Sequence, residues 1–515
     1  MACLTVLGII GAAYLIPGAE RFRLFDPKVA EATDPPAASD LASAPEGEVR
    51  LVEETKDRPE LALGSSELVP QETPGLAPLP HAVREKAPPV PIIDPTSLDP
   101  FFKALVAVER KEDRAIARIV HYGDSLLAVD FVTGTLRRLL QGRFGDAGHG
   151  YMPIANPWPG YFHNDVYRRA SSEWTVSRVV GPISPDGFYG LGGVSFRGLN
   201  RGAWARYGTT KEGDFGRAVS RFGVQYLEHP GGGIIEIAVD KEQIITIETA
   251  GETPSFRERI IEVPDGPHQF ELRVAKGPVR AFGTWMERDT PGVVLDSIGL
   301  QGARLRFLDQ SNDEHYADAL RTRDPHLVVF EFGLNESTDG YAYPMERYRE
   351  TSLVLMNKIR AALPNAACLV VAPNDVARKK GTHLESASIM PELVRAQREV
   401  AAEVGCAFFD TYQAMGGTGS MPNWVGRGLG QPDLIHPTTV GADVIGTWIF
   451  RALMDAYEPF RASHGGTSSH TADASAGASG AAGAASVPAG ASAGASAGAP
   501  ASPVISTPAA SSSSH

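Results

Sequence analysis

The chain has 515 residues, of which 43% are hydrophobic, and a formal net charge of -13 at pH 7. An acidic chain lacks the basic face with which proteins usually bind nucleic-acid phosphates, so we expect no nucleic-acid partner. Its three cysteines, Cys3, Cys368 and Cys406, have no metal-site spacing and cannot form a dense disulfide framework. The histidines form no close His/Cys pattern either, so no metal site is predicted.

The two ends of the chain differ in composition from its centre. Residues 1–25 begin with the apolar run MACLTVLGIIGAAYLIP, which is short for a spanning helix and lacks the basic start of a secretory signal. This run is interpreted as a signal-anchor, as an export signal whose start lies upstream, or as a hydrophobic N-terminal helix; export or anchoring is favoured. Residues 26–99 are predicted to be a proline-rich disordered linker, and residues 462–515 a disordered tail rich in Ala, Gly and Ser. This organisation suits a cell-envelope protein, periplasmic or membrane-anchored and facing outward.

Residues 100–150 are predicted to be the first part of an α/β domain. The pattern indicates a buried strand from Ala115 to Val120, then a turn at Gly123 that places Ser125 at the start of a helix. In that position Ser125 is either an ordinary N-cap serine or a nucleophile beside helix N–H groups, which favour a neighbouring anion.

Residues 151–290 change to short alternating segments separated by turn residues, which predict an inserted β-sandwich of jelly-roll type. An insertion at a loop is tolerated because the entropy of loop closure grows slowly with length. The pair Asp265-Gly266 predicts a hairpin between two of these strands. The clearest strand segments are Gly223–Leu227, Ile234–Val239, Gln243–Glu248, Glu258–Val263 and His268–Ala275.

Residues 291–461 alternate between strand and helix patterns, as in a parallel sheet covered by helices. Together with the strand before Ser125, they predict about five strands, a small three-layer α/β domain. The predicted strands are Val293–Ile298, His326–Phe332, Ala367–Ala372 and Cys406–Asp410, and the predicted helices are Asp313–Arg323, Pro344–Leu363, Pro391–Val404 and Val440–Tyr457.

Polar residues that suit hydrolysis follow several of these strands. In open α/β sheets ligands bind beyond the carboxyl ends of the strands, so these residues are expected to converge. Gly302 lies in a glycine turn and Asn335 at a strand tip, where each is either an ordinary turn residue or a donor for an oxyanion. Asp433 and His436 lie three residues apart, a spacing that lets the carboxylate orient the imidazole toward a serine.

The motifs GDS, glycine turn, G-x-N and D-x-x-H occur in the order found in the SGNH (GDSL) hydrolase family, which the chain therefore resembles. The resemblance covers the first strand and its turn, and then residues 293–452. It implies a flavodoxin-like three-layer α/β/α sandwich, here with an inserted jelly-roll-like β-sandwich, and a carboxylic ester hydrolase that needs no metal or other cofactor.

The resemblance also assigns roles to individual residues. Ser125 would attack an ester carbonyl, His436 would accept its proton and Asp433 would orient His436. The N–H groups of Ser125 and Gly302 and the amide of Asn335 would stabilise the oxyanion. The chain departs from the family pattern in having Glu336 after Asn335, where many members have Asp, and in reading GDSLL at the first motif. These departures put the substrate subclass in doubt.

The inserted sandwich resembles carbohydrate-binding-like modules of bacterial envelope acetylesterases, including peptidoglycan O-acetylesterases. The resemblance implies removal of O-acetyl groups from a polysaccharide; an O-acetyltransferase with the same triad and a non-catalytic glycan-binding protein are the alternatives. Trp158 and Trp424 are candidate substrate contacts; core packing is the more common role for an aromatic residue such as Trp158, and the loop of Trp424 could instead form a mobile rim. Substrate contact and core packing are also the two interpretations of aromatic residues of the insert, among them Trp204, Tyr226 and Trp285.

Overall fold

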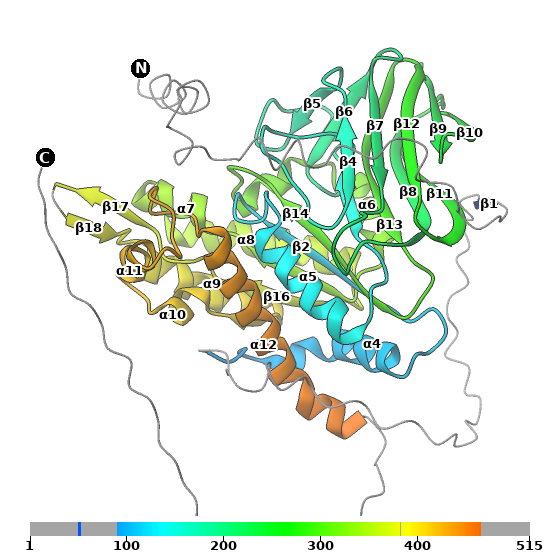
Figure 1. Cartoon of the computed structure of the whole chain (residues 1–515). Helices are drawn as coiled ribbons and strands as arrows, with labels where there is room; N and C mark the ends of the chain where they lie inside the picture. Colours follow the sequence, from blue (N-terminus) through cyan, green and yellow to red (C-terminus); the bar gives the residue numbers. More distant parts are fainter. Residues whose placement is uncertain (1–49, 53–89, 382, 465–515) are drawn as a thin grey trace, which may run out of the picture. The chain divides into compact units, whose positions relative to one another are not determined.

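The computed structural model of the protein describes residues 50–52, 90–381 and 383–464 (Figure 1). The predicted signal or anchor segment, residues 1–25, lies outside this part of the chain, as do most of the predicted linker and tail. Among the helices that the structure describes, none is long and apolar enough to cross a membrane.

Five parallel strands form the central sheet of an α/β domain. In sheet order they are β14 (Gly292–Gly299), β2 (Ile116–Gly123), β15 (Leu327–Glu331), β16 (Ala367–Val371) and β19 (Ala407–Phe409). Nearly all of their residues are buried, because helices cover both faces of the sheet and leave no strand face to solvent. Numbered along the chain, this order is 2-1-3-4-5, which is the flavodoxin-like order and confirms the predicted fold class.

Two groups of helices cover the sheet (Figure 1). One group packs together beside β2 and β14, and its members are α4 (Asp99–Glu109), α5 (Phe131–Phe144) and α12 (Thr439–His464). The other group consists of α6 (Asp313–Arg323), α8 (Met345–Ala362) and α9 (Met390–Val404). The apolar periodicity predicted the bounds of α6, α8 and α9 to within a residue at each end, because each buries one continuous face.

Shorter elements occupy the connections of the α/β domain. They are η3 (Pro95–Leu98), η4 (Leu305–Gln310), α7 (Leu334–Asp339), η5 (Gly340–Ala342), β17 (Ala377–Lys380), β18 (His383–Ser386), α10 (Thr411–Met415) and α11 (Ser420–Gly426). Four of these, α7, η5, β17 and β18, follow the carboxyl ends of β15 and β16, where the sequence places its polar motifs.

The segment between α5 and β14, together with one short strand from residues 50–52, forms two antiparallel sheets, as the sandwich prediction requires (Figure 1). One sheet contains β1 (Arg50–Val52), β11 (Ser255–Gly266), β8 (Val219–Glu228), β13 (Val279–Glu287), β6 (Val194–Gly198) and β5 (Thr175–Arg178), with β3 (Gly150–Pro153) paired to β13. The other contains β10 (Gln243–Glu248), β9 (Ile234–Val239), β12 (Gln269–Lys276), β7 (Trp204–Gly208) and β4 (Tyr167–Ala170). Alternate side chains along strands such as β9 and β12 are buried, because one face of each sheet packs on the core.

The hairpin predicted at Asp265-Gly266 is wrong. β11 ends at Gly266 and pairs with β8, whereas β12 pairs with β7 and β9 in the other sheet, so this connection crosses the sandwich. The hairpin in this region joins β9 to β10 and turns at Asp240 and Lys241, both at positive φ. A local turn signature fixes the bend of the chain but not the sheet in which the next strand pairs.

The predicted boundaries of the disordered segments also need correction. Within the predicted linker 26–99, residues 50–52 form β1 at the edge of the sandwich beside β11. The described chain resumes at Val90, and Ile93 exchanges backbone hydrogen bonds of 2.9 and 3.0 Å with Phe408. At the other end α12 continues to His464, three residues beyond the predicted boundary at 461. Composition alone did not reveal these short ordered stretches because each depends on a tertiary partner.

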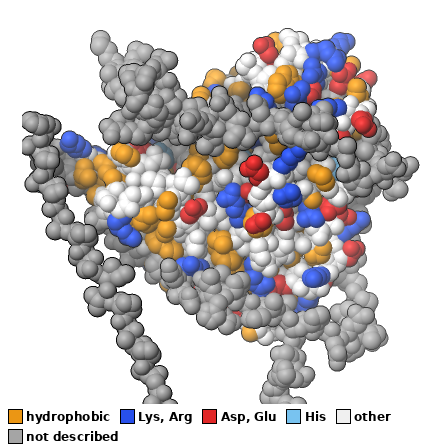
Figure 2. Space-filling model, viewed as in Figure 1, with side chains coloured by type: hydrophobic (Ala, Val, Ile, Leu, Met, Phe, Trp, Pro, Cys, Tyr) orange, Lys and Arg blue, Asp and Glu red, His pale blue; other side chains and the backbone are white. Residues whose placement is uncertain are grey.

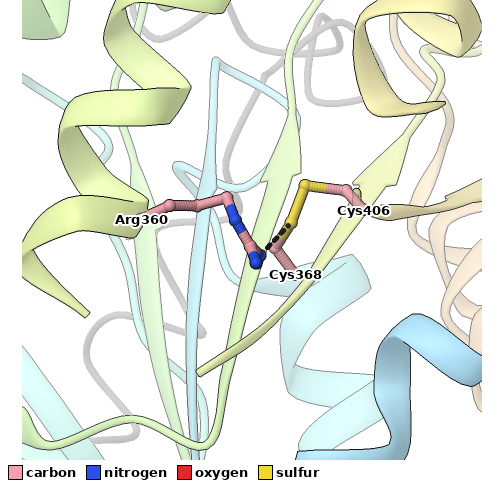
Figure 3. Close-up of a disulfide and its surroundings, with 3 residues drawn as sticks. All are labelled: Arg360, Cys368 and Cys406. Atoms are coloured by element: carbon pink, nitrogen blue, oxygen red, sulfur yellow. Dashed lines mark hydrogen bonds between the residues drawn. A yellow bond between two sulfur atoms is a disulfide. The ribbon is translucent and has the colours of Figure 1, made fainter. Parts of the chain in front are cut away.

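A disulfide joins two strands of the parallel sheet. Cys368 lies in β16 and Cys406 directly precedes β19, and their Cα atoms are 4.8 Å apart (Figure 3). The guanidinium of Arg360 in α8 donates a hydrogen bond of 3.3 Å to the Cys368 sulfur. The sequence did not identify this pair, because the spacing of two cysteines does not show that their strands are neighbours.

A buried ionic network joins the α/β domain to the sandwich. Arg323, at the end of α6, donates to Asp296 in β14 at 2.8 Å and to Glu287 in β13 at 2.6 Å. Glu287 also accepts from Arg118 at 2.9 Å and from Arg221 at 2.8 Å. Burial of the Glu287 carboxyl opposes its ionisation, but the charges of Arg118 and Arg323 hold its pKa below the usual range. The network therefore links strands of the parallel sheet and strands of one sandwich sheet to helix α6.

Replacing Arg323 by Met is expected to destabilise the protein by about 3–5 kcal/mol, because Asp296 and Glu287 lose a buried counter-charge. The midpoint of urea unfolding, followed by tryptophan fluorescence, measures this change. Arg321→Met is the matched control, since the Arg321 side chain is 55% exposed and its ion pair with Asp318 lies at the surface. Equal unfolding midpoints for the two variants would contradict a structural role for the network.

Candidate active site

Ser125 lies in a tight loop at the carboxyl end of β2. The loop packs closely on the neighbouring strands, and this explains two glycines. A Cβ at Gly123 would lie 2.6 Å from the side chain of Leu127 and 2.8 Å from the Glu331 carbonyl oxygen. A Cβ at Gly299, at the end of β14, would lie 2.2 Å from the backbone nitrogen of Ala128. The sequence around GDS is therefore constrained by packing as well as by chemistry.

The predicted helix start at Ser125 is wrong. Residues 124–130 form turns, and α5 begins only at Phe131. The loop closes through backbone bonds from Leu127 to Asp124 and from Ala128 to Ser125, both 3.3 Å long. An oxyanion beside Ser125 would therefore be stabilised by single N–H groups rather than by the end of a long helix.

Ser125, His436 and Asp433 form a hydrogen-bonded chain. The Oγ of Ser125 lies 2.8 Å from the Nε2 of His436, and the Nδ1 of the same ring lies 2.7 Å from an Asp433 carboxylate oxygen. The second Asp433 oxygen accepts backbone bonds from Ile435 at 2.9 Å and His436 at 3.0 Å, which fix the carboxylate. This network places the ring proton on Nδ1 and leaves Nε2 free to take the proton of Ser125.

The charges of the triad support the same assignment. Partial burial of the His436 ring lowers its pKa, but the hydrogen bond and charge of Asp433 more than offset this and raise the pKa above 6.5. Burial opposes ionisation of Asp433, yet its bond to His436 keeps the pKa of the carboxyl below its usual range. Asp433 is therefore ionised at neutral pH, and the imidazolium that would form during reaction is stabilised.

The loop that carries Asp433 and His436 is attached to the end of β16. The side-chain amide of Asn374 donates to the Ile435 carbonyl at 2.8 Å, and the N–H of Ala377 donates to the Leu434 carbonyl at 2.8 Å. The predicted residues therefore come from the loops after β2, β14 and α11 and from the start of α7, which follows β15, and they meet at one edge of the sheet.

The predicted oxyanion donors lie at the same edge. Gly302 has a φ of +78°, and nothing lies within 4 Å of the position that a Cβ would take, so backbone conformation rather than space favours glycine there. In the described part of the chain, the N–H groups of Ser125 and Gly302 donate to no protein acceptor. Asn335 donates one amide N–H to the Ala303 carbonyl at 3.0 Å, which orients the amide and leaves its second N–H available.

Asp124 connects the loop that carries Ser125 to the start of α7, which carries Asn335. Its carboxylate accepts from the N–H of Leu126 and from the N–H of Leu334, both at 3.1 Å. Burial raises the pKa of Asp124 to about 7, while the Leu126 bond opposes this shift and the nearby Glu336 adds to it. The GDS motif contains Asp124 but does not reveal this second partner, because Leu334 lies 210 residues away in the sequence.

Glu336, in α7, connects this helix to the turn that contains Gly302. One carboxylate oxygen accepts from the N–H of Leu305 at 2.8 Å, three residues after Gly302. Burial raises the pKa of Glu336 to about 7, against the effect of the Leu305 bond. The departure from the family pattern at this position is thus part of the support of the site. The only sign of this role in the sequence was the acidic residue that follows Asn335.

The aromatic residues predicted to contact substrate are buried. Trp158 and Trp424 are only 8% and 3% exposed, and the ring of Trp424 packs against that of Trp448 at 5.7 Å. In the insert, Trp285 is 3% exposed and donates to Glu258 at 2.8 Å. The packing interpretation therefore holds for these residues, because tertiary contacts cover the faces on which a sugar would stack.

The part of the chain that the structure describes contains no group of three or more His, Cys, Asp or Glu residues arranged to hold a metal ion. The chemistry available at this edge is that of the serine, the imidazole and the hydrogen-bond donors around them. Such an arrangement suits nucleophilic attack on a carbonyl group followed by hydrolysis of an acyl-serine.

Comparison with known proteins agrees with this geometry. Residues 267–444 match the sequence profile of the GDSL-like Lipase/Acylhydrolase family. The match contains Gly302, Asn335, Asp433 and His436. Ser125 lies outside it, because in the sequence Ser125 precedes the inserted sandwich. No curated protein sequence matches the chain.

One solved structure shares the fold over most of its length, and others show a weaker similarity. A structure described as a peptidoglycan O-acetylesterase in action is 21% identical, covers 70% of this chain and 96% of its own, and has a TM-score of 0.60. A catalytic mutant of an acetylxylan esterase from Geobacillus stearothermophilus is 18% identical, with 32% and 73% of the two chains covered and a TM-score of 0.24. A lipase/acylhydrolase from Enterococcus faecalis is 19% identical, with 32% and 77% covered and a TM-score of 0.24.

The rate of ester hydrolysis is expected to rise with pH as His436 loses its proton, with a midpoint above the ordinary value of 6.5. Asp433→Asn removes the charge that raises the pKa of His436, so this midpoint should shift to lower pH. By comparison with other serine triads, kcat should also fall roughly 10³- to 10⁴-fold. The kcat/KM for p-nitrophenyl acetate, measured from pH 5 to 9, records both effects. An unchanged midpoint in Asp433→Asn would contradict the assigned pairing.

Proposed function

Because the chain contains a hydrolase domain of the SGNH (GDSL) family and is a carboxylic ester hydrolase, we propose that it removes O-acetyl groups from a polysaccharide. The acetyl ester would belong to peptidoglycan or to another envelope or plant glycan. The observation that carries the proposal is the Ser125–His436–Asp433 chain, with unengaged N–H groups beside the nucleophile.

The reaction would proceed in two steps. Ser125 Oγ attacks the acetyl carbonyl while Nε2 of His436 takes the serine proton, and the tetrahedral oxyanion is held by the N–H groups of Ser125 and Gly302 and the amide of Asn335. His436 then returns the proton to the departing sugar oxygen, leaving an acetyl-serine. Water, deprotonated by His436, attacks this ester, and collapse of the second oxyanion releases acetate and restores Ser125.

The apolar side chains exposed at this edge of the sheet favour a large substrate such as a polysaccharide. Phe162 is 45% exposed, and its N–H donates to the carbonyl of Ala128 in the loop of Ser125. Tyr341, which follows α7, is 66% exposed, and Val440, four residues after His436, is 59% exposed. These side chains, rather than Trp158 and Trp424, offer faces on which sugar rings can pack.

Two further observations support a glycan substrate. The sandwich and the α/β domain form one compact unit joined by the buried Arg323 network, so the sandwich is held in a fixed position relative to the triad. The solved peptidoglycan O-acetylesterase shares this fold over 96% of its length.

The purified protein is expected to release acetate from O-acetylated peptidoglycan or acetylated xylan as well as from p-nitrophenyl acetate. Ser125→Ala should reduce each rate by roughly 10⁴-fold or more, because it removes the nucleophile. Acetate is measured by an enzyme-coupled assay after removal of free acetate. Hydrolysis of the aryl ester without release from any polysaccharide would sink the glycan proposal while leaving the esterase intact.

The same experiment distinguishes hydrolysis from transfer. A transferase would move the acetyl group from Ser125 to a sugar hydroxyl, so an added unacetylated glycan would gain acetyl esters. Mass spectrometry of that acceptor detects the gain. We expect acetate in solution and an unmodified acceptor.

We also propose that the protein works in an oxidising compartment such as the cell envelope. The disulfide between Cys368 and Cys406 supports this placement, because such bonds form and persist outside the reducing cytosol. Alkylation of protein in freshly lysed cells, followed by peptide mass spectrometry, tests it. Both cysteines should resist alkylation until a reductant is added; alkylation of both before reduction would contradict the proposal.

A further inference from the structure

The β17–β18 hairpin projects from the edge of the sheet that carries the triad. Its first residue, Ala377, donates to the carbonyl of Leu434, which lies between Asp433 and His436. Because a strand rises about 3.3 Å per residue, the next three residues lie within roughly 10 Å of that contact along the strand. The hairpin is therefore part of the surroundings of the active site (Figure 1).

The base of this hairpin is firmly attached. Ser386, opposite Ala377, donates to the buried carboxylate of Asp375 at 2.7 Å, and the same oxygen accepts from the N–H of Met421 at 3.0 Å. The hydroxyl of Ser386 accepts from the N–H of Gly419 at 2.8 Å. These bonds fix the direction of the hairpin relative to the loop of Asp433 and His436.

The exposed part of the hairpin is basic. Arg378, Lys379 and Lys380 form the only run of three consecutive basic residues in the sequence, and all three are exposed. Across the hairpin, Glu385 pairs with Lys380 at 3.0 Å and faces Arg378 in the strand register. One carboxylate against three cations leaves two positive charges in excess. Figure 2 shows basic side chains at the end of the molecule where Figure 1 places β17 and β18.

This local charge is opposite in sign to that of the chain, which has 61 acidic and 48 basic residues. An acidic protein repels a polyanion over most of its surface, so a fixed positive hairpin attached to the loop of Asp433 and His436 would orient such a polymer toward the triad. Leu384, opposite Lys379, is 48% exposed and adds an apolar contact of the kind a sugar chain uses.

We propose that the β17–β18 hairpin binds carboxylate groups of the glycan, so that the enzyme acts on a polysaccharide bearing free carboxylates in preference to a neutral one. This inference rests on the proposed function, whose substrate class it narrows. Arg378 and Lys379 make the contacts, because Lys380 is already paired with Glu385. Two suitable sources of carboxylate are the stem peptides of peptidoglycan and the uronic acids of other glycans.

The test compares Arg378→Gln/Lys379→Gln with the wild type on four substrates. O-acetylated peptidoglycan and acetylated pectin carry carboxylates from the two sources, whereas acetylated xylan stripped of uronic acids and p-nitrophenyl acetate carry none. On whichever carboxylated polymer is the substrate, kcat/KM of the variant should fall about five- to ten-fold, mostly because KM rises. On the two substrates without carboxylates, kcat/KM should not change. The loss on the carboxylated polymer should shrink as salt rises toward about 1 M, because salt screens exposed charges.

Lys211→Gln/Arg217→Gln is the matched control. It removes the same two charges from the loop between β7 and β8, where Gly216 donates to Asp146 beside the start of β14, at the opposite edge of the sheet. This control should behave as the wild type. An equal loss on p-nitrophenyl acetate in the hairpin variant, or no loss on either carboxylated polymer, would overturn the inference.

Binding separates this inference from the proposed function. In the Ser125→Ala background, co-sedimentation with insoluble peptidoglycan or with cross-linked pectin should be weakened by the hairpin substitutions and by amidation of the polymer's carboxylates. A wild type that binds in this way but releases no acetate would refute the proposed function and retain the hairpin's role. Binding that is insensitive to both changes would refute the hairpin's role alone.

Discussion

The pairing of β2 with β14 is the constraint on which the whole molecule depends. These two strands lie side by side over their full length, from Ile116 opposite Gly292 to Gly123 opposite Gly299. All of the described sandwich strands except β1 are inserted between them in sequence. The pairing can form only if the insert returns the chain to the point where it left, and the entropy of closing such a long loop grows only slowly with length. The Arg323 network, which links β13, β14 and α6, then fixes the insert against the sheet.

This arrangement brings the active site together from distant parts of the chain. The loop of Ser125 follows β2, the turn of Gly302 follows β14, and α7, which carries Asn335, follows β15. Neighbouring strands therefore bring these three groups to one edge of the sheet. Asp124 and Glu336 then connect these segments through backbone N–H groups. Each is buried with a pKa near 7, so their ionised forms carry a desolvation cost that the hydrogen bonds offset only in part. Such a cost is acceptable where donor positions decide the rate of reaction.

The chemistry and the choice of substrate reside in different parts of the fold. The triad and its donors recognise only the ester group, which is common to many compounds. Under the proposed function, the surfaces that a polymer would meet are the exposed apolar side chains around the triad and the basic hairpin after β16. Because these surfaces lie outside the central sheet, they can change while the α/β architecture and its triad stay the same.

The sequence by itself determined the fold class, the bounds of α6, α8 and α9, the approximate positions of the five parallel strands, and the residues of the candidate triad. It could do so because buried strands and amphipathic helices leave periodic patterns, and because Ser125, Gly302, Asn335, Asp433 and His436 belong to short motifs in a fixed order. Tertiary structure alone decided which strand pairs with which. The Asp265-Gly266 turn leads into the other sheet, Cys368 meets Cys406, and α5 begins six residues after Ser125.

The same limit applies to individual side chains. Burial of Trp158 and Trp424, and the second partners of Asp124 and Glu336, depend on contacts between residues far apart in the chain. Local sequence carries information about nearest neighbours along the chain, whereas exposure and long-range hydrogen bonds are properties of the packed molecule. A motif can therefore name the nucleophile, but only the folded chain shows what holds it in place and what surface the substrate meets.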